Sequence, residues 1–227
     1  MFFTMVDRIN RAVLSDLNEE LVLAYQIVKD RVEELIEVLK NHERAHRDKG
    51  YYLHIRAQEP VDALDIVARF IYLNKTCFNG LYRVNKRGKF NVPKGRYKNP
   101  DICNPERLRA ASKALASATI RMGDFEKIVK PGVDDFIYCD PPYDNCFNGY
   151  QSVGFGKSDQ KRLRNAINGW ADIGAAVMLS NSDTPLIRGL YRKRDRFAIH
   201  ATKAPRLINS RADGRGSVAE LIVTTYG

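Results

Sequence analysis

The tetrapeptide Asp140-Pro141-Pro142-Tyr143 contains the residue types that chemistry on the amino group of a nucleobase requires. Such an amine is a poor nucleophile because its lone pair is conjugated into the ring. The Asp140 carboxylate and the Pro141 carbonyl can accept the amine hydrogens and localise the lone pair, and neither proline has an N–H group that would interfere. The Tyr143 ring offers a surface for a base that has left the stack. A rigid proline turn with a helix-capping Asp140 is the alternative interpretation.

The apolar segment directly before this tetrapeptide predicts the strand that positions it. Phe136–Cys139 has the pattern of a buried strand, and ligands of open α/β sheets bind beyond the carboxyl ends of strands. Other apolar runs predict strands at Arg11–Ser15, Thr119–Met122, Ala175–Leu179, Arg196–Ala201 and Val218–Tyr226. Helical patterns cover Leu21–Leu39, Val61–Lys75, Pro105–Ser117, Ser158–Ala171 (with Ser158 as its cap) and Thr184–Arg194. This alternation predicts an α/β fold with a mainly parallel sheet.

The composition is that of a globular protein with a core. The chain has 227 residues, of which 44% are hydrophobic, and this content excludes intrinsic disorder. No apolar run approaches the roughly 18 residues of a membrane span, and the first residues lack the three-part form of a signal peptide. The four cysteines form no Cys-x-x-Cys pair; they are Cys77, Cys103, Cys139 and Cys146. We therefore expect free thiols and a cytoplasmic location.

Positive charge is concentrated in one segment. The net charge is +10, and the 35 residues from Ile66 to Pro100 hold nine Lys and Arg residues but no Asp or Glu. Aromatic residues lie among these cations. Within the segment, Leu81–Val92 has a Lys-Arg-Gly turn between two strand-like runs, which predicts a hairpin. A solvated basic face is one interpretation, but this combination is typical of a surface that binds a nucleic-acid backbone.

Five blocks of sequence resemble the DNA adenine N6-methyltransferases of the Dam class. The blocks are Leu14–Asn18, Cys77–Arg83, Gly88–Lys98, Asp140–Tyr143 and Leu179–Thr184. They occur in family order and span almost the whole chain. The Phe-Asn-Val-Pro-x-Gly-Arg-Tyr sequence in the third block is far more specific than Asp-Pro-Pro-Tyr alone. The resemblance implies a Rossmann-like sheet of the S-adenosylmethionine-dependent methyltransferases.

The resemblance also implies roles for individual residues. The reaction would transfer a methyl group from S-adenosylmethionine to adenine N6 in duplex DNA, with no metal ion. Asp140–Tyr143 match the catalytic loop, and Asp140 also belongs to the expected cofactor-binding residues. Asp16 matches the acidic residue that holds the ribose hydroxyls of the cofactor. Asp124 and Phe125 match the pair that contacts the cofactor adenine, although a helix cap is the alternative role for Asp124.

A set of DNA contacts and a domain organisation follow from the same resemblance. Residues 1–40 and 106–227 would form the methyltransferase domain, and residues 41–105 an inserted target-recognition subdomain with helices and a hairpin. Arg83 is the best candidate for a bidentate guanine contact, and the other cations would bind phosphates. The expected DNA-binding residues are Phe78, Asn79, Leu81, Arg83, Lys86, Lys89, Pro93, Arg96 and Lys98. The hairpin favours a GATC-like site. We expect a monomer that binds double-stranded DNA, at a bacterial nucleoid or on phage DNA.

The start of the sequence departs from the family pattern. Family members begin with Lys-Trp-x-Gly-Gly-Lys, a strand and a Phe-x-Gly-x-Gly loop that holds the methionine part of the cofactor, and this sequence has none of them. That strand would lie between the strands Arg11–Ser15 and Phe136–Cys139. We therefore expect weak cofactor binding and little activity for this chain alone. A gene start placed too late, a split protein or a degraded gene would each account for the departure.

Two other functions are alternatives. The first is a DNA-binding remnant without catalysis. The second is a zinc hydrolase, because His42-Glu43-Arg44-Ala45-His46 fits the His-Glu-x-x-His pattern. A zinc site usually needs a third protein ligand, and the charged residues around this motif predict a solvated helix end.

Overall fold

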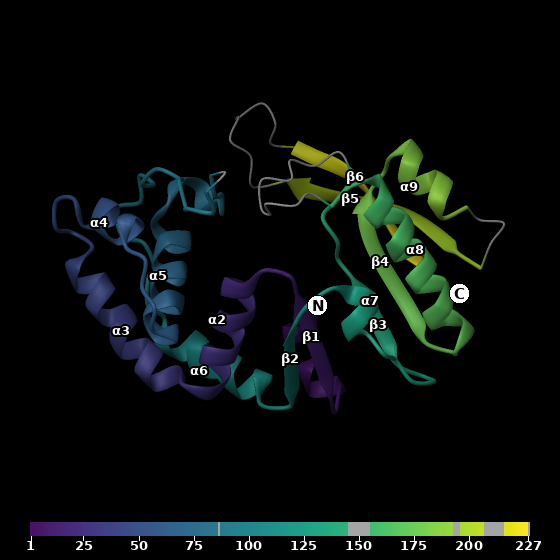
Figure 1. Ribbon diagram of the computed structural model, residues 1–227, viewed down its shortest axis with the longest axis horizontal. Helices are drawn as coiled ribbons and strands as arrows, with labels where there is room; N and C mark the ends of the chain where they lie inside the picture. Colours follow the sequence, from purple (N-terminus) through teal and green to yellow (C-terminus); the bar gives the residue numbers. More distant parts are fainter. Residues whose placement is uncertain (86, 145–154, 193–195, 207–215, 227) are drawn as a thin grey trace. The chain divides into compact units, whose positions relative to one another are not determined.

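The structure is a computed structural model of the chain (Figure 1), and it describes residues 1–85, 87–144, 155–192, 196–206 and 216–226. Lys86 and Cys146 therefore lie outside the described residues. The chain divides into two compact units, Met1–Asp124 and Phe125–Gly227. Each unit has a hydrophobic core of its own.

All six predicted strands correspond to observed strands, with bounds shifted by a few residues. The strands are β1 (Ala12–Asp16), β2 (Ala118–Met122), β3 (Phe136–Cys139), β4 (Ala176–Ser182), β5 (Ala198–Arg206) and β6 (Gly216–Thr224). The helices are α1 (Phe2–Met5), α2 (Glu19–Asp30), α3 (Val32–Ala45), α4 (Tyr51–Ala57), α5 (Ala63–Thr76), α6 (Pro105–Leu115), α7 (Phe125–Ile128), α8 (Lys157–Asp172) and α9 (Pro185–Leu190). Two short 3-10 helices are η1 (Val6–Arg8) and η2 (Phe78–Gly80).

In the unit Met1–Asp124, a pair of parallel strands packs beside a group of helices. β1 and β2 pair in a register that ends at Asp16 opposite Met122, so their carboxyl ends meet at one edge. α2, α3, α5 and α6 pack against one another. The apolar side chains of α3 recur on one face, and Leu35, Ile36 and Leu39 are fully buried there.

The long helix predicted across Leu21–Leu39 is wrong, because the segment forms two helices. Arg31 separates α2 from α3 with φ −136° and ψ 38°, values that no helix adopts. Its guanidinium donates to Glu34 in the first turn of α3, at 2.9 and 2.6 Å. The break has no Gly or Pro signal, and the apolar spacing continues across it, so periodicity alone conceals it.

The predicted hairpin across Leu81–Val92 is present with short arms. Val84 and Phe90 form an antiparallel bridge, and the Gly88 N–H donates to the carbonyl of Asn85 at 2.9 Å. Gly88 has φ +74°, a conformation that glycine adopts at little cost. Arg87 and Gly88 therefore form a turn at the place that the sequence predicts.

A hydrophobic cluster attaches this hairpin segment to the helices α4 and α5. Its buried residues are Tyr52, Ile55, Tyr72, Leu73, Cys77, Phe90, Val92 and Ile102. Gly95 lies where the segment returns toward the end of α5, and a Cβ added there would be 2.7 Å from the Cys77 carbonyl oxygen. Only glycine allows the two backbone segments to approach so closely.

In the unit Phe125–Gly227, four strands form a mixed sheet in the order β3-β4-β6-β5. β3 and β4 are parallel, whereas β6 is antiparallel to both of its neighbours. Three of the four strands therefore run in one direction, as a mainly parallel sheet requires, and β6 alone is reversed. Nine residues separate β5 from β6, and a parallel crossover needs about a dozen or more. α8 lies along one face of this sheet (Figure 1). Its residues Leu163, Ile167 and Trp170 belong to the same hydrophobic core as Val177, Leu179, Leu221 and Val223 of the sheet.

β3 is less buried than its apolar sequence predicts. Phe136 and Tyr138 are 45% and 39% exposed, whereas Ile137 and Cys139 pack against the core of the unit. Among the residues that the structure describes, β3 pairs only with β4, and β1 pairs only with β2. A four-residue apolar run fits a strand with one or two buried faces equally well, so the sequence does not distinguish them.

The helix caps in this unit follow two different patterns. Gly156, and not the predicted Ser158, precedes α8, and its N–H donates to the Asp159 carboxylate at 2.9 Å. Thr184 caps α9, since its hydroxyl accepts the Ile187 N–H at 3.3 Å. The helix ends at Leu190, earlier than predicted. No helix in the described ranges is both long and apolar enough to cross a membrane.

Leu39→Ala is expected to destabilise the first unit by about 2–5 kcal/mol, because it removes core atoms and leaves a cavity. Leu39 is 0% exposed on α3. Leu53→Ala removes the same atoms from a side chain that is 55% exposed on α4, and about 0.5 kcal/mol or less is expected there. Urea unfolding followed by far-ultraviolet circular dichroism measures both, and equal losses would contradict the core assignment.

Candidate active site and nucleic-acid interface

Asp140 lies directly after β3, and a hydroxyl group from the neighbouring strand β4 holds its side chain. Ser180 Oγ donates to Asp140 Oδ1 at 2.8 Å, and the Tyr138 hydroxyl lies 3.0 Å from the same Ser180 oxygen. Asp140 Oδ2 accepts no hydrogen bond from the residues that the structure describes. One carboxylate oxygen therefore orients the side chain, and the other is available for a ligand.

The loop that follows β3 is fixed by buried polar side chains of β4 and α8. Asn181 is 0% exposed; its Oδ1 accepts the Asp144 N–H at 3.0 Å, and its Nδ2 donates to Gln160 Oε1 at 3.1 Å. Gln160 in turn donates from Nε2 to the Pro142 carbonyl at 3.0 Å. The Thr184 hydroxyl donates to the Asp144 carboxylate at 2.6 Å. These polar groups satisfy one another and hold Pro142 and Asp144 in place.

The fixed loop presents two hydrogen-bond acceptors side by side in the chain. Gln160 occupies the Pro142 carbonyl, whereas the Pro141 carbonyl accepts no hydrogen bond within the described part of the chain. Burial raises the pKa of Tyr143 to about 12, so its hydroxyl stays protonated beside Asp140. The Asp140 carboxylate, the Pro141 carbonyl and an aromatic ring can together bind a planar group that carries an amine.

Cys139, which precedes Asp140, is held in its protonated thiol form by burial. Burial raises the pKa of its thiol to about 12. A thiol is reactive as the thiolate, which is scarce at neutral pH for this residue. At the carboxyl end of β3, the reactive group is therefore the Asp140 carboxylate. The Cys139 thiol packs against the core of the unit.

In the first unit, the parallel strands β1 and β2 bring Asp16 and Asp124 to the same carboxyl edge. The Gly123 N–H donates to the Asp16 carbonyl at 3.1 Å. Asp16 Oδ1 accepts the Asn18 N–H at 2.7 Å, and the Asn18 side chain caps α2 by accepting the Leu21 N–H at 3.2 Å. The Asp16 side chain is exposed, so its second oxygen can meet a ligand.

Phe125 begins α7 in the second unit, directly after Asp124. The guanidinium carbon of Arg162 lies 5.1 Å from the centroid of its ring, and the Phe155 ring lies 6.3 Å away. Sequence reasoning did not predict either contact. The cofactor residues inferred from the resemblance are thus divided, with Asp16 and Asp124 in the first unit and Phe125 and Asp140 in the second.

The residues predicted to contact DNA lie on the hairpin and on η2 before it. Phe78 is 38% exposed, and Asn79 adopts a left-handed conformation with φ +55°. The exposed Arg83 donates from Nε to Asn91 Oδ1 at 2.7 Å, across the hairpin. Its Nη2 also donates to the Asn91 carbonyl at 3.4 Å, so within the described residues only Nη1 forms no hydrogen bond, and a bidentate base contact would use Nη1 together with a nitrogen that now bonds to Asn91.

The other predicted DNA contacts have different degrees of exposure. Leu81 is partly buried, whereas the remaining described contacts are exposed; these are Lys89, Pro93, Arg96 and Lys98. Lys89 forms an ion pair with Glu59 in which both side chains are mostly exposed. Such surface pairs contribute little to stability, so this cation can exchange its partner for a phosphate. Lys86 lies outside the described residues.

Comparison with known proteins identifies the family of this chain. The family model for D12 class N6 adenine-specific DNA methyltransferases matches residues 1–208. The chain belongs to this class. The Type II methyltransferase M1.LlaDCHI of Lactococcus lactis subsp. cremoris is 41% identical over 241 residues, which cover 100% of this chain and 83% of the relative. The retron Ec67 DNA adenine methylase of Escherichia coli is 36% identical, over 94% of this chain and 75% of the relative. The DNA adenine methylase of Vibrio cholerae serotype O1 is 35% identical, over 93% of this chain and 79% of the relative.

The resemblance inferred from the five sequence blocks is thus confirmed. This member of the D12 class is an adenine-specific DNA methyltransferase, and the family uses S-adenosylmethionine. DNA and S-adenosylmethionine are therefore its partners at the level of the family. The roles of individual residues, the bounds of the inserted subdomain and the target sequence stay predictions.

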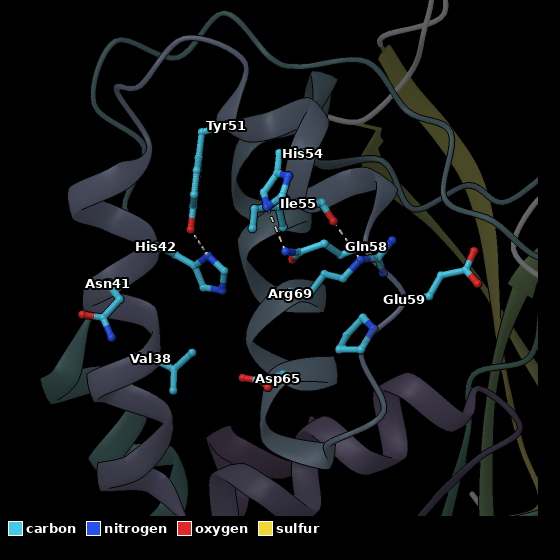
Figure 2. Close-up of a pocket in the computed structure, with 11 residues that line it drawn as sticks. Val38, Asn41, His42, Tyr51, His54, Ile55, Gln58, Glu59, Asp65 and Arg69 are labelled. Atoms are coloured by element: carbon cyan, nitrogen blue, oxygen red, sulfur yellow. Dashed lines mark hydrogen bonds between the residues drawn. The ribbon is translucent and has the colours of Figure 1, made fainter.

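The histidines of the zinc-like motif in this D12-class chain bind tyrosine hydroxyls. His42 Nδ1 lies 2.8 Å from the Tyr51 hydroxyl (Figure 2), and His46 Nδ1 lies 3.0 Å from the Tyr72 hydroxyl. The charged residues that follow the motif are exposed, as a solvated helix end predicts. The histidines themselves depart from that expectation, because His46 is 8% exposed and burial lowers the pKa of both imidazoles. In the parts of the chain that are described, no three His, Cys, Asp or Glu residues group together as metal ligands would.

Sequence reasoning did not assign roles to the residues that fix the catalytic loop. Ser180 and Asn181 directly follow a buried apolar run in β4, and polar residues at the carboxyl end of a strand are a usable signal. Gln160 gives no such signal, because it is one polar residue on the face of α8 that also carries Leu163 and Ile167.

Asn181→Ala is expected to destabilise the second unit by about 1–3 kcal/mol, because it leaves the buried Gln160 carbonyl and the Asp144 N–H without partners. Asn165→Ala makes the same change at an exposed position of α8 and serves as the control. Trp170 is the single tryptophan of the chain and lies in this unit, so its fluorescence during urea unfolding measures both variants. The assignment fails if the two variants lose the same stability.

Proposed function

We propose that this chain methylates adenine N6 within a short GATC-like site of duplex DNA, as a monomer in the cytoplasm. Membership of the D12 class supports adenine-specific methyl transfer. The observation that carries the residue-level proposal is the fixed loop after β3, in which Ser180 orients Asp140 and Gln160 occupies Pro142. Asp140 Oδ2 and the Pro141 carbonyl are left as neighbouring acceptors.

In the proposed mechanism, these two acceptors bind the two hydrogens of the adenine amine. The nitrogen lone pair is then turned out of conjugation with the ring and becomes nucleophilic. S-adenosylmethionine supplies a methyl group on a sulfonium sulfur that is a good leaving group. The Asp140 carboxylate also stabilises the positive charge that develops on the nitrogen, and the Tyr143 ring stacks with the base outside the helix.

The carboxyl edge of β1 and β2 fits the nucleoside part of S-adenosylmethionine. Asp16 uses one oxygen for the Asn18 N–H, and within the described ranges its Oδ2 accepts no hydrogen bond. A carboxylate at the carboxyl end of a strand can accept hydrogen bonds from two neighbouring ribose hydroxyls. We assign Asp124 to the adenine amine of the cofactor and Phe125 to stacking on its ring.

The hairpin is assigned to DNA recognition. Arg83 would read a guanine through a bidentate contact, with Phe78, Asn79, Leu81 and Pro93 beside it. The cations Lys86, Lys89, Arg96 and Lys98 would bind phosphates and set the register. The absence of acidic residues from the whole segment 66–100 supports this assignment.

Methyl transfer to short duplexes tests the proposed function against the expectation, drawn from the first residues of the sequence, that this chain alone has little activity. The chain is incubated with S-adenosylmethionine labelled in its methyl group and with duplexes that contain 5′-GATC-3′ or a version with one base pair changed. Label should enter the first duplex and not the second. Transfer to both alike would contradict the target site, and binding without transfer would identify a DNA-binding remnant.

Asp140→Ala is expected to abolish methyl transfer, because it removes the carboxylate that binds the amine, and to leave DNA affinity nearly unchanged. Asp172→Ala is the matched control: it removes an exposed carboxylate of the same unit that pairs with Arg196. Initial rates of label transfer and fluorescence anisotropy with duplex DNA measure the two effects. A rate for Asp140→Ala close to that of the unchanged chain would show the assigned role to be wrong.

Arg83→Ala is expected to relax discrimination at one base pair by about 1–3 kcal/mol, as for the loss of a bidentate contact. Lys89→Ala is expected to weaken binding to all duplexes alike and to reduce the slope of log affinity against log salt by about one unit. Anisotropy titrations of both variants with both duplexes, at several salt concentrations, distinguish a base contact from a phosphate contact. Equal losses for Arg83→Ala on both duplexes would place Arg83 among the phosphate contacts.

A further inference from the structure

Tyr82 precedes Arg83 on the hairpin and points to the opposite side. Its ring packs between Phe70 of α5 and Phe90 of the other hairpin arm, with centroid distances of 5.6 and 5.8 Å. Its hydroxyl donates to Glu20 Oε2 at 2.5 Å. Burial, together with this carboxylate, raises the pKa of Tyr82, so the hydroxyl remains a donor at neutral pH.

Glu20 is itself held in place by a partly buried cation. It lies in the first turn of α2, and its Oε1 is 3.9 Å from Arg69 Nη1. Arg69 is 13% exposed in its side chain and donates to two carbonyls at the end of α4. Arg69 Nε donates to the Ile55 carbonyl at 3.0 Å, a bond that Figure 2 draws, and Arg69 Nη2 donates to the Arg56 carbonyl at 2.9 Å. These two bonds fix Arg69, whose charge attracts the Glu20 carboxylate at ion-pair distance.

The two arms of the hairpin are attached to different helices. The second arm is held by α4, because the Tyr52 hydroxyl and Arg56 Nη1 both donate to the Val92 carbonyl, at 2.8 and 3.2 Å. The first arm is held by α2, through the Tyr82 hydroxyl. The arms are joined to each other, because the Asn91 N–H donates to the Arg83 carbonyl at 3.1 Å and the Asn85 N–H to the Lys89 carbonyl at 2.9 Å. The bond to Glu20 is therefore the hydrogen bond that attaches this pair of arms to α2.

We propose that the hydrogen bond between Glu20 and Tyr82 determines sequence specificity by fixing the position of the hairpin arm that presents Arg83. The proposal rests on the proposed function, in which Arg83 reads a base. A bidentate base contact needs an accurately placed guanidinium, whereas contacts to phosphates fix orientation and carry no sequence information directly. Loss of the bond should therefore reduce discrimination between sequences and leave the affinity for unrelated DNA unchanged.

Tyr82→Phe tests the proposal, because it keeps the ring contacts and removes only the hydroxyl. Anisotropy titrations of the whole chain are made with a duplex containing 5′-GATC-3′ and with one in which a single base pair is changed. The ratio of the two affinities is expected to fall about 3- to 10-fold, the worth of one hydrogen bond. Tyr51→Phe is the matched control, since it removes a hydroxyl bonded to His42 in the same unit, and its ratio should not change.

Substitutions of Glu20 make the test specific to the bond. Glu20→Gln keeps an oxygen acceptor and should retain the ratio of the unchanged chain, whereas Glu20→Ala should lower it as Tyr82→Phe does. The double variant Glu20→Ala with Tyr82→Phe should show no further loss if the bond is the cause. An unchanged ratio for Tyr82→Phe, or an equal loss of affinity on both duplexes, would overturn the proposal.

Arg83→Ala separates this proposal from the proposed function. If Arg83→Ala lowers the ratio and Tyr82→Phe does not, the positioning role of Glu20 and Tyr82 is wrong and the reading role of Arg83 stands. If neither variant changes the ratio, or if the unchanged chain does not discriminate between the duplexes, base reading by Arg83 is wrong and the positioning role with it.

Discussion

The buried amide of Asn181 is the constraint on which the catalytic loop depends. An amide offers an acceptor and donors on one small group, and here the acceptor takes the Asp144 N–H while the donor holds Gln160. Gln160 then holds the Pro142 carbonyl. Pro142 and Asp144 are thereby fixed from one buried point, and the two acceptors that precede them in the chain, Asp140 Oδ2 and the Pro141 carbonyl, accept no hydrogen bond from the described residues.

The sheet explains why this amide is in the right place. β3 and β4 are parallel neighbours, so their carboxyl ends lie together and Asp140 follows one strand while Ser180 and Asn181 end the other. The apolar residues earlier in β4, such as Val177 and Leu179, pack into the core. The change from apolar to polar residues along β4 thus converts a core strand into a support for the loop. The same logic holds in the first unit, where β1 and β2 bring Asp16 and Asp124 to one edge.

The parts of the fold that the sequence predicts are those with local signals. Apolar runs predict all six strands, and Asp140–Tyr143 is found from its residue types alone. The interruption at Arg31 is not predictable from periodicity, because the apolar positions continue on both sides of it. Gln160 and the bond between Tyr82 and Glu20 are also hidden, since each depends on residues far apart in the sequence that only the tertiary fold brings together. The exposed face of β3 is a further case, because burial of a short strand is decided by its neighbours.

The central claim is that the loop after β3 acts on the amine of adenine in DNA. The most direct measurement is the identity of the methylated nucleoside, obtained by digesting duplex DNA after incubation with the chain and S-adenosylmethionine and analysing the nucleosides by mass spectrometry. The account predicts N6-methyladenosine in its deoxy form as the sole methylated product. Methylation of cytosine, or DNA bound by the chain but left unmethylated, would contradict it.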